Sequence, residues 1–211
     1  HAIDIPMAEK NIEAELNRLS KLKYKKSFIF LRVKDSMHFK RIKNHPIAHL
    51  IDGYVLPKYN YTTAPKYNKY INEDDVIMPI IENELFDTAK LDSCFGYIDE
   101  IKNSILCVRV GITDIFNLFS LRRPKESTIY SHPIGARVIT DLLIRANALN
   151  LRLSGPVFEA YSTKSKAVLS EEVKAEVTMG IYTKSTIHPD QIKHIEQQYR
   201  VTKSDLESAK L

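Results

Sequence analysis

Short, continuous apolar runs alternate with amphipathic stretches along the chain. The runs are rich in β-branched residues, as in strands that helices cover on both faces. They are Phe28–Val33, Tyr54–Pro57, Val76–Ile81, Ile105–Val110, Leu153–Phe158 and Ile181–Ile187. Most of them start 22–29 residues apart, which suits repeated strand–helix units. The pattern therefore predicts a parallel sheet with helices between the strands.

The amphipathic stretches predict the helices. In the first one, Ile12, Leu16 and Leu19 share one stripe. Pro189 suits a first helical turn, and Thr202 begins a motif like a capping box. The expected helices are Met7–Leu22, Glu84–Asp92, Gly135–Leu149, Ser170–Met179, Pro189–Tyr199 and a final helix after Thr202.

The parallel sheet is either open or closed into a barrel. Glycine is scarce, at 6 of 211 residues, and neither GxGxxG nor GxxxxGK[ST] occurs, which disfavours a nucleotide-binding open sheet. Charged or titratable residues follow the strand ends: Arg32, Lys58, Glu82, Asp114, Lys184 and His188. Active residues of a barrel lie at the carboxyl ends of its strands, so this pattern favours a (β/α)8 TIM barrel. Only six of its eight strands are visible.

Composition fits one globular domain spanning residues 1–211, with 44% apolar and 27% charged residues. The longest apolar run has six residues, so we expect no membrane span, and no signal peptide is recognisable. Cys94 and Cys107 are isolated from each other along the chain, and neither belongs to a CxxC pair. We expect buried thiols in a reducing cytoplasm.

The net charge of +5 has a local origin. Residues 21–43 hold nine basic side chains and one acid, Asp35. Such a window attracts phosphates or carboxylates, from nucleic acid or from the phosphate tail of a coenzyme A. The alternative is a solvated helix face. Abundant tyrosine would suit a nucleic-acid-binding protein, but no recognised binding motif occurs and the net charge is modest.

Glu82 and Asp114 are the leading candidates for a metal site. Each follows an apolar strand, so both carboxylates would point into the mouth of a barrel. Two carboxylates without a neighbouring His or Cys form a hard oxygen site that suits Mg²⁺. The alternative is that either acid caps a helix or pairs with a lysine.

Other polar residues have weaker functional interpretations. His45 and His49 stand four apart, but Pro46 lies between them and no glutamate accompanies them, which disfavours a metal site. We expect His188 to be structural, at a helix start. Arg122 and Arg123 would contact a phosphate, a neighbouring subunit, or only solvent.

Several segments together resemble a known family. They are LRV (31–33), VLPK (55–58), PIIEN (79–83), VGITDIFNLFSLRR (110–123) and TKSTIHPDQI (183–192). This succession is similar to the citrate lyase beta-subunit group of the HpcH/HpaI aldolase superfamily. The last two segments are the most specific, and the resemblance runs from about Arg32 to the C-terminus.

The resemblance implies a (β/α)8 barrel, a Mg²⁺ cofactor, and cleavage or formation of carbon–carbon bonds. Its usual substrates are CoA thioesters of 3-hydroxy acids, such as citryl-, malyl- or citramalyl-CoA, and related 2-oxo or hydroxy acids. By motif, Glu82 and Asp114 would be the metal ligands. Arg32 would bind the substrate carboxylate or the developing enolate oxygen, and Lys58 would support the site.

The chain departs from the family pattern at its start. Members open with two further strands, the second ending in an Asp-Leu-Glu-Asp-like motif that has no match here. We therefore expect a barrel without its first two strands. Lys34 replaces a usual Asn, and Pro156 and Glu159 stand where relatives carry an Asp-rich pattern. A non-catalytic subunit or scaffold is the alternative to an enzyme.

We also expect a homo-oligomer, because missing strands would expose sheet edges. Residues 189–211 are the segment expected to reach a neighbouring subunit. Ile192, Ile195 and Tyr199 share one stripe that would be buried there. The alternative is that this stripe packs on its own barrel.

Overall fold

The computed structural model describes residues 5–21, 27–83, 85–123, 126–160, 162 and 165–210. Within them, five parallel strands form one sheet in which each strand pairs with the next along the chain. The strands are β1 (Phe30–Arg32), β2 (Gly53–Leu56), β3 (Ile77–Ile81), β4 (Val108–Val110) and β5 (Leu153–Ser154). This sequential order without crossovers is that of a barrel wall, and five of the six predicted runs are confirmed as strands.

The sixth predicted run is not a strand. Beside β5 the chain makes a single parallel bridge between Gly155 and Lys184. The N–H of Gly155 donates to the carbonyl of Thr183 at 2.7 Å, and the N–H of Ser185 donates to the carbonyl of Gly155 at 3.2 Å. Pairing stops there because Pro156, which follows, has no N–H to donate.

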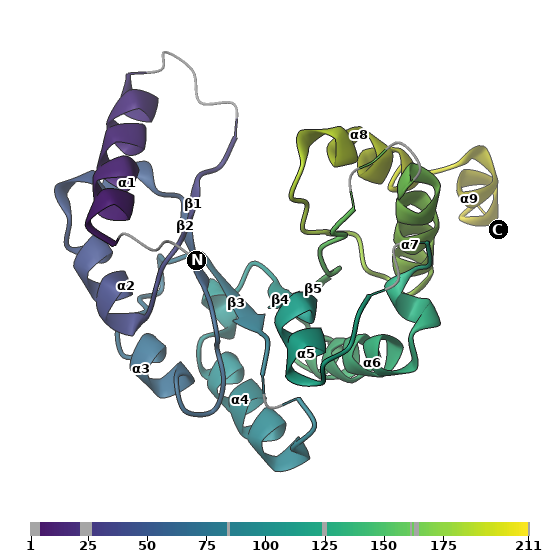
Figure 1. Cartoon of the computed structure of the whole chain (residues 1–211), viewed down its shortest axis with the longest axis horizontal. Coiled ribbons are helices and arrows are strands. Elements are labelled where there is room, and N and C mark those ends of the chain that lie inside the picture. The colour runs from purple at the N-terminus through teal and green to yellow at the C-terminus, as the bar shows by residue number, and fades with distance from the viewer. Residues whose placement is uncertain are drawn as a thin grey trace.

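Helices precede, connect and follow the strands (Figure 1). They are α1 (Ile5–Ser20), α2 (Ser36–Lys43), α3 (Ala64–Asn68), α4 (Thr88–Glu100), α5 (Ile112–Leu118), α6 (Pro133–Ala148), α7 (Lys166–Thr178), α8 (Pro189–Gln198) and α9 (Lys203–Ser208). Short 3₁₀ turns are η1 (Pro46–Leu50), η2 (Lys102–Ser104) and η3 (Ile129–Ser131). None of the helices in the described part of the chain has the length and apolar character needed to cross a bilayer.

The sequence pattern placed one helix wrongly and missed two others. The helix predicted over Glu84–Asp92 begins at Thr88, because the Asp87 side chain accepts the N–H of Lys90 as its N-cap, and residue 84 lies outside the described residues. Helix α2 was hidden in the basic window, where it buries only Phe39 and Ile42. Helix α5 lies in an apolar stretch that continues from β4 and lacks a helical period. Leu22, the predicted end of α1, is outside the described residues.

The main core lies between the sheet and its helices. Tyr54 and Leu56 of β2 and Ile77 of β3 belong to this core together with Phe39 of α2. The rings of Phe39 and Tyr54 meet edge to face, with centroids 4.9 Å apart. Strand side chains alternate between the two faces of a sheet, so the residues between these core positions point to the other face.

We call that other face the inner face. Register places Arg32 of β1 level with Val55 and Met78, and Arg109 of β4 level with Ile80. The inner-face residues are Arg32, Val55, Met78, Ile80, Arg109 and Ser154. Two arginines therefore share the interior of the barrel wall, where aliphatic residues usually dominate.

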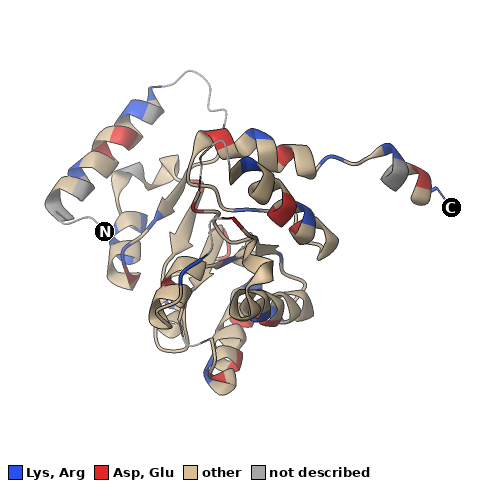
Figure 2. Cartoon of the chain, turned by 45° about the vertical axis from the view of Figure 1, so that its right-hand side comes forward, with Lys and Arg blue, Asp and Glu red and all other residues tan. Residues whose placement is uncertain are grey.

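The C-terminal stripe packs partly on its own chain. Ile195 of α8 is buried with Phe158, Leu169 and Val173, and Tyr199 packs against the same cluster. Ile192 is 44% exposed, so its predicted burial is not met within the single chain. Helix α9 extends away from the rest of the molecule (Figure 2), and every residue of 201–210 whose burial is described is exposed. The expected homo-oligomer stays a prediction.

Candidate active site

Glu82 follows β3 directly and is buried, with 3% of its surface exposed. Its Oε1 accepts a hydrogen bond of 2.6 Å from the backbone N–H of Lys58, which follows β2. Lys58 has a φ of 50°, in the left-handed region that residues other than glycine seldom adopt. The strained turn after β2 thus presents a backbone donor to the carboxylate after β3.

Asp114 lies in the first turn of α5, three residues after Gly111. Its carboxyl lies close enough to that of Glu82 to raise the pKa of Glu82, and both line one cavity, so the structure brings together the two acids singled out in the sequence. Burial, together with this neighbouring acid, raises the pKa of Glu82 to about 7, while the Lys58 N–H and the charge of Arg32 act in the opposite direction. Two carboxyls in contact share a proton unless a cation replaces it.

A cavity of about 370 Å³ opens beside this pair of acids. Its lining residues are Lys58, Glu82, Asn83, Asp114, Asn117 and Leu118. The two asparagine amides add oxygen atoms to those of the carboxylates. Asn83 and Asn117 were missed as site residues, although adjacency to Glu82 and one-turn spacing from Asp114 were readable in the sequence.

The donors around this cavity fit Mg²⁺ better than a softer metal. Among the described residues, no cluster of three or more His, Cys, Asp or Glu side chains gathers anywhere. A cation here would therefore rely on two carboxylates and on amide, water or substrate oxygens. Mg²⁺ accepts this set, because it commonly keeps waters and binds one or two carboxylates.

Arg32 ends β1 on the inner face and is exposed. Its positive charge is close enough to Glu82 to lower the pKa of that carboxyl. Arg32, Lys58, Glu82 and Asp114 thus lie at or shortly after the carboxyl ends of β1, β2, β3 and β4, at one end of the sheet.

Arg109 is a second arginine of this region that the sequence interpretation missed. It stands in the middle of the apolar run of β4. A single charged residue inside such a run was the feature of the sequence that could have identified it. Its Nε and Nη2 donate to the Ser185 Oγ, at 3.1 and 2.9 Å. Burial lowers the pKa of Arg109, the charge of Arg32 lowers it further, and Glu82 raises it.

Lys184 was expected at the rim of the barrel. Its side chain is instead completely buried against α7. Its ammonium donates to Glu172 at 3.0 Å, to Glu176 at 2.5 Å and to the carbonyl of Pro156 at 2.9 Å. Arg123 forms an ion pair with the same Glu172. Lys184 points towards α7, opposite to Ser185 on the inner face, because neighbouring residues of an extended chain alternate. The family-like segments around 123 and 184 thus form a structural network.

The remaining candidates have structural contacts. His188 is the N-cap of α8: its Nδ1 accepts the N–H of Asp190 at 3.2 Å, which confirms the structural interpretation. The Nε2 atom of His45 lies 3.3 Å from a carboxylate oxygen of Glu13. Arg122 is exposed, unlike Arg123.

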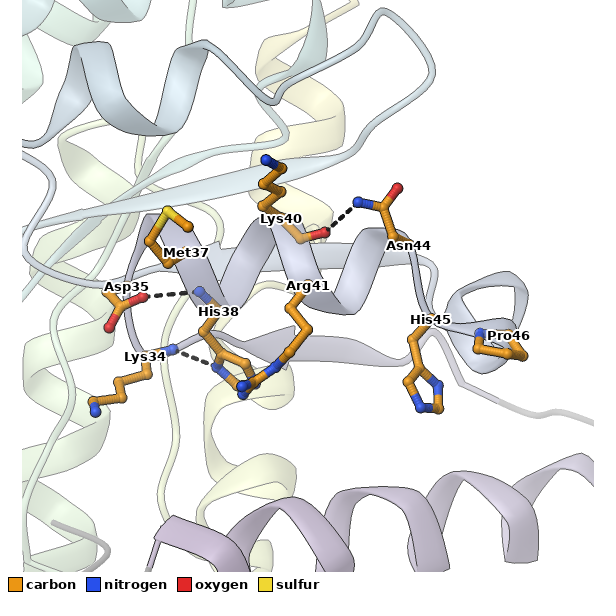
Figure 3. A pocket seen from close by; sticks show the side chains of 9 residues that line it. All are labelled: Lys34, Asp35, Met37, His38, Lys40, Arg41, Asn44, His45 and Pro46. Carbon is orange, nitrogen blue, oxygen red and sulfur yellow. Dashed lines mark hydrogen bonds between the residues drawn. The ribbon is translucent and has the colours of Figure 1, made fainter.

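The basic window forms a groove along α2 that we call the α2 groove (Figure 3). It measures about 660 Å³ and begins with the residues after β1. Its lining residues are Lys34, Asp35, Met37, His38, Lys40, Arg41, Asn44, His45 and Pro46. Asp35 is the only acid among them, and it caps α2 by accepting the N–H of His38 at 2.8 Å. Residues 22–26, which hold three of the nine basic side chains, lie outside the described residues.

The whole chain, residues 1–211, matches the model of a protein family described as C–C bond lyase of the TIM-barrel fold. A comparison with curated protein sequences finds no match.

Solved structures resemble the fold. RipC from Yersinia pestis is 14% identical with a TM-score of 0.69, over 98% of this chain and 88% of that one. CitE from Mycobacterium tuberculosis, solved with magnesium, acetoacetate and coenzyme A, is 16% identical with a TM-score of 0.67, over 94% and 70%. The citrate lyase beta subunit from M. tuberculosis, solved with oxaloacetate and magnesium, is 15% identical with a TM-score of 0.63, over 94% and 84%.

Proposed function

Because this chain belongs to the C–C bond lyase family of the TIM-barrel fold, we propose that it is a Mg²⁺-dependent carbon–carbon lyase. Its substrate would be a 3-hydroxyacyl-CoA or a related 2-oxo or hydroxy acid. The observation that carries the proposal is the contact between Glu82 and Asp114 beside a cavity, with Arg32 close by.

Glu82 and Asp114 would hold the metal. Their proximity, which raises the pKa of Glu82, marks a position where a dication would replace a proton between two carboxylates. Mg²⁺ bound there would supply positive charge to substrate oxygens. The Lys58 N–H fixes one oxygen of Glu82, so this carboxylate is oriented before any ligand arrives.

Arg32 would stabilise the charge that develops on the substrate. When the bond between the α and β carbons breaks, its electron pair stays on the α carbon and spreads onto the adjacent carbonyl oxygen as an enolate. A base accepts the β-hydroxyl proton as that carbon becomes a carbonyl, and a proton then adds to the α carbon of the enolate to give the second product. A guanidinium donates two parallel N–H bonds to such an oxyanion or to a carboxylate.

The α2 groove supports a CoA thioester as the substrate. It begins just after Arg32, so an acyl group at the acidic pair and a phosphate tail in the groove would lie at the same end of the sheet. Lys34, Lys40 and Arg41 supply the positive charge there. CitE from M. tuberculosis was solved with coenzyme A and magnesium, which is consistent with this substrate class.

The test is an assay of the purified chain with citryl-, malyl- and citramalyl-CoA, with Mg²⁺ or with a chelator. We expect cleavage of at least one thioester, lost with the chelator and in Asp114→Asn. A chain that binds Mg²⁺ but cleaves none of them would favour the non-catalytic relative. Salt-dependent binding of DNA or RNA would instead favour the nucleic-acid-binding alternative.

A further inference from the structure

Arg109 is a cation of the inner face without a carboxylate partner. Within the described residues it forms no ion pair, and its two hydrogen bonds both go to the neutral hydroxyl of Ser185. The other cations withdrawn from solvent are each paired with acids: Lys43 with Asp75, Arg123 with Glu172, and Lys184 with Glu172 and Glu176.

A partly desolvated cation without a counter-charge destabilises the folded chain. Burial lowers the pKa of Arg109, and the like charge of Arg32 acts in the same direction. Two arginines thus face the interior, and Cys107 and Glu82 are the groups that oppose this lowering of the Arg109 pKa. An anion between the two arginines would relieve this imbalance.

The guanidinium of Arg109 retains the donors to bind such an anion. It has five N–H groups, and the hydroxyl of Ser185 accepts from Nε and from Nη2. Both N–H groups of Nη1 and one of Nη2 are not used by Ser185. This fork geometry matches the two oxygens of a carboxylate.

Arg109 also lies close to the proposed site, on the strand next to the one that Glu82 follows. It is level with Ile80, two residues before Glu82 on the neighbouring strand, and on the same face as Arg32. A short substrate held at the acidic pair would reach deeper along the inner face to Arg109.

We propose that Arg109 binds a second carboxylate of the substrate and thereby selects dicarboxylic acyl groups over monocarboxylic ones. Ser185 is a positioning residue that orients the guanidinium from the opposite side. This inference rests on the proposed function of the Glu82–Asp114 site, and it assigns a specificity-determining residue within it.

The test is calorimetric binding of L-malate and (R)-3-hydroxybutyrate to the chain in the presence of Mg²⁺, since 3-hydroxybutyrate carries a methyl group where malate carries the second carboxylate. A charge-assisted bidentate contact predicts that malate binds roughly 10- to 100-fold more tightly. Arg109→Gln is expected to reduce this ratio to about twofold or less while 3-hydroxybutyrate binding is retained. Ser185→Ala, which keeps the charge but frees the guanidinium, is expected to reduce the ratio only partly.

Arg137→Gln is the matched control, because Arg137 is an exposed arginine on α6 and should leave the ratio unchanged. The Tm separates a binding role from a structural one: removal of an unpaired inner cation should leave the Tm of Arg109→Gln equal or higher. If Arg109→Gln does not fold, Arg109→Lys decides between the two roles. A folded Arg109→Lys with a reduced ratio supports the binding role, whereas an unchanged ratio or a second failure to fold overturns the inference.

Equal affinity of the wild-type chain for malate and 3-hydroxybutyrate would overturn this inference and leave the lyase proposal intact. An unchanged ratio in a folded Arg109→Gln would do the same. A chain that binds neither Mg²⁺ nor either acid would overturn both proposals.

Discussion

Glu82 occupies the space that a side chain at Gly111 would need. A Cβ atom at position 111 would lie 2.8 Å from the Glu82 Oε2 and in hard contact with the Glu82 Cβ. The glycine after β4 therefore lets the carboxylate after β3 turn towards Asp114 and the Lys58 N–H. The absence of a side chain at position 111 is therefore required for the observed position of the Glu82 carboxylate.

Gly111→Ala should accordingly displace the Glu82 carboxylate. We expect Mg²⁺ affinity to fall about tenfold or more, since loss of one charge-assisted contact is worth about 1.5–3 kcal/mol. Calorimetric titration of Mg²⁺ measures this. Gly96→Ala is the matched control, because a Cβ there meets nothing within 4 Å and lies in α4, where alanine stabilises a helix by roughly 0.5–1 kcal/mol. Equal Mg²⁺ affinity in both variants would contradict the packing argument.

Arg32→Lys should reduce turnover more than stability. Lysine keeps the charge but lacks the fork that holds a carboxylate or enolate oxygen in fixed geometry. We expect kcat/KM to fall roughly 10- to 100-fold, equivalent to about 1.4–2.8 kcal/mol, with little change in Tm because Arg32 is exposed. Steady-state kinetics and thermal melts check this. A collapse of Tm would identify Arg32 as a structural residue instead.

Glu176 gives the fold a pH dependence. Burial raises the pKa of its carboxyl to about 7 from a usual value of 4.5, although Lys184 opposes the shift, and its buried Oε2 has no hydrogen-bond partner among the described residues. The folded chain therefore holds this proton more tightly than the unfolded chain. Its stabilising contribution is full below pH 4.5 and is lost as the pH rises towards 7.

Glu176→Gln removes this titration while keeping the shape. The free energy of unfolding of the wild type, relative to the variant, should fall by about 1–3 kcal/mol between pH 4.5 and 7. Urea unfolding at several pH values measures this difference. Parallel stability profiles for the two chains would show that the group does not titrate in this range.

The exposed apolar residues of the segment 201–210 favour self-association of the chain. Val201 is 74% exposed and Leu206 of α9 is 53% exposed. A second copy of the chain would cover such apolar residues at the end of an extended segment. Light scattering should show an oligomer for the wild type and a smaller species for Leu206→Glu. A stable wild-type monomer would be incompatible with this prediction.

The strand positions were readable because five apolar runs carry the continuous pattern of buried strands, and their carboxyl ends located Glu82 and Asp114. Helix α5 was not readable, because Ile112, Ile115 and Phe116 are buried within seven residues of an already apolar stretch. The sequence did not predict that Lys184 is buried in an ion-pair network while Arg109 lies on the inner face. Which face a side chain occupies depends on the strand register, and a single sequence does not give that register.

The most direct test of the acidic pair is calorimetric titration of Mg²⁺ into the wild-type chain and Asp114→Asn. We expect one site in the wild type and an affinity at least about tenfold weaker in the variant, since a carboxylate ligand is lost. Asp99→Asn is the control, because Asp99 forms an exposed ion pair with Lys102. The same Mg²⁺ affinity in all three chains, with all three folded, would contradict the assignment of Glu82 and Asp114 as the metal site.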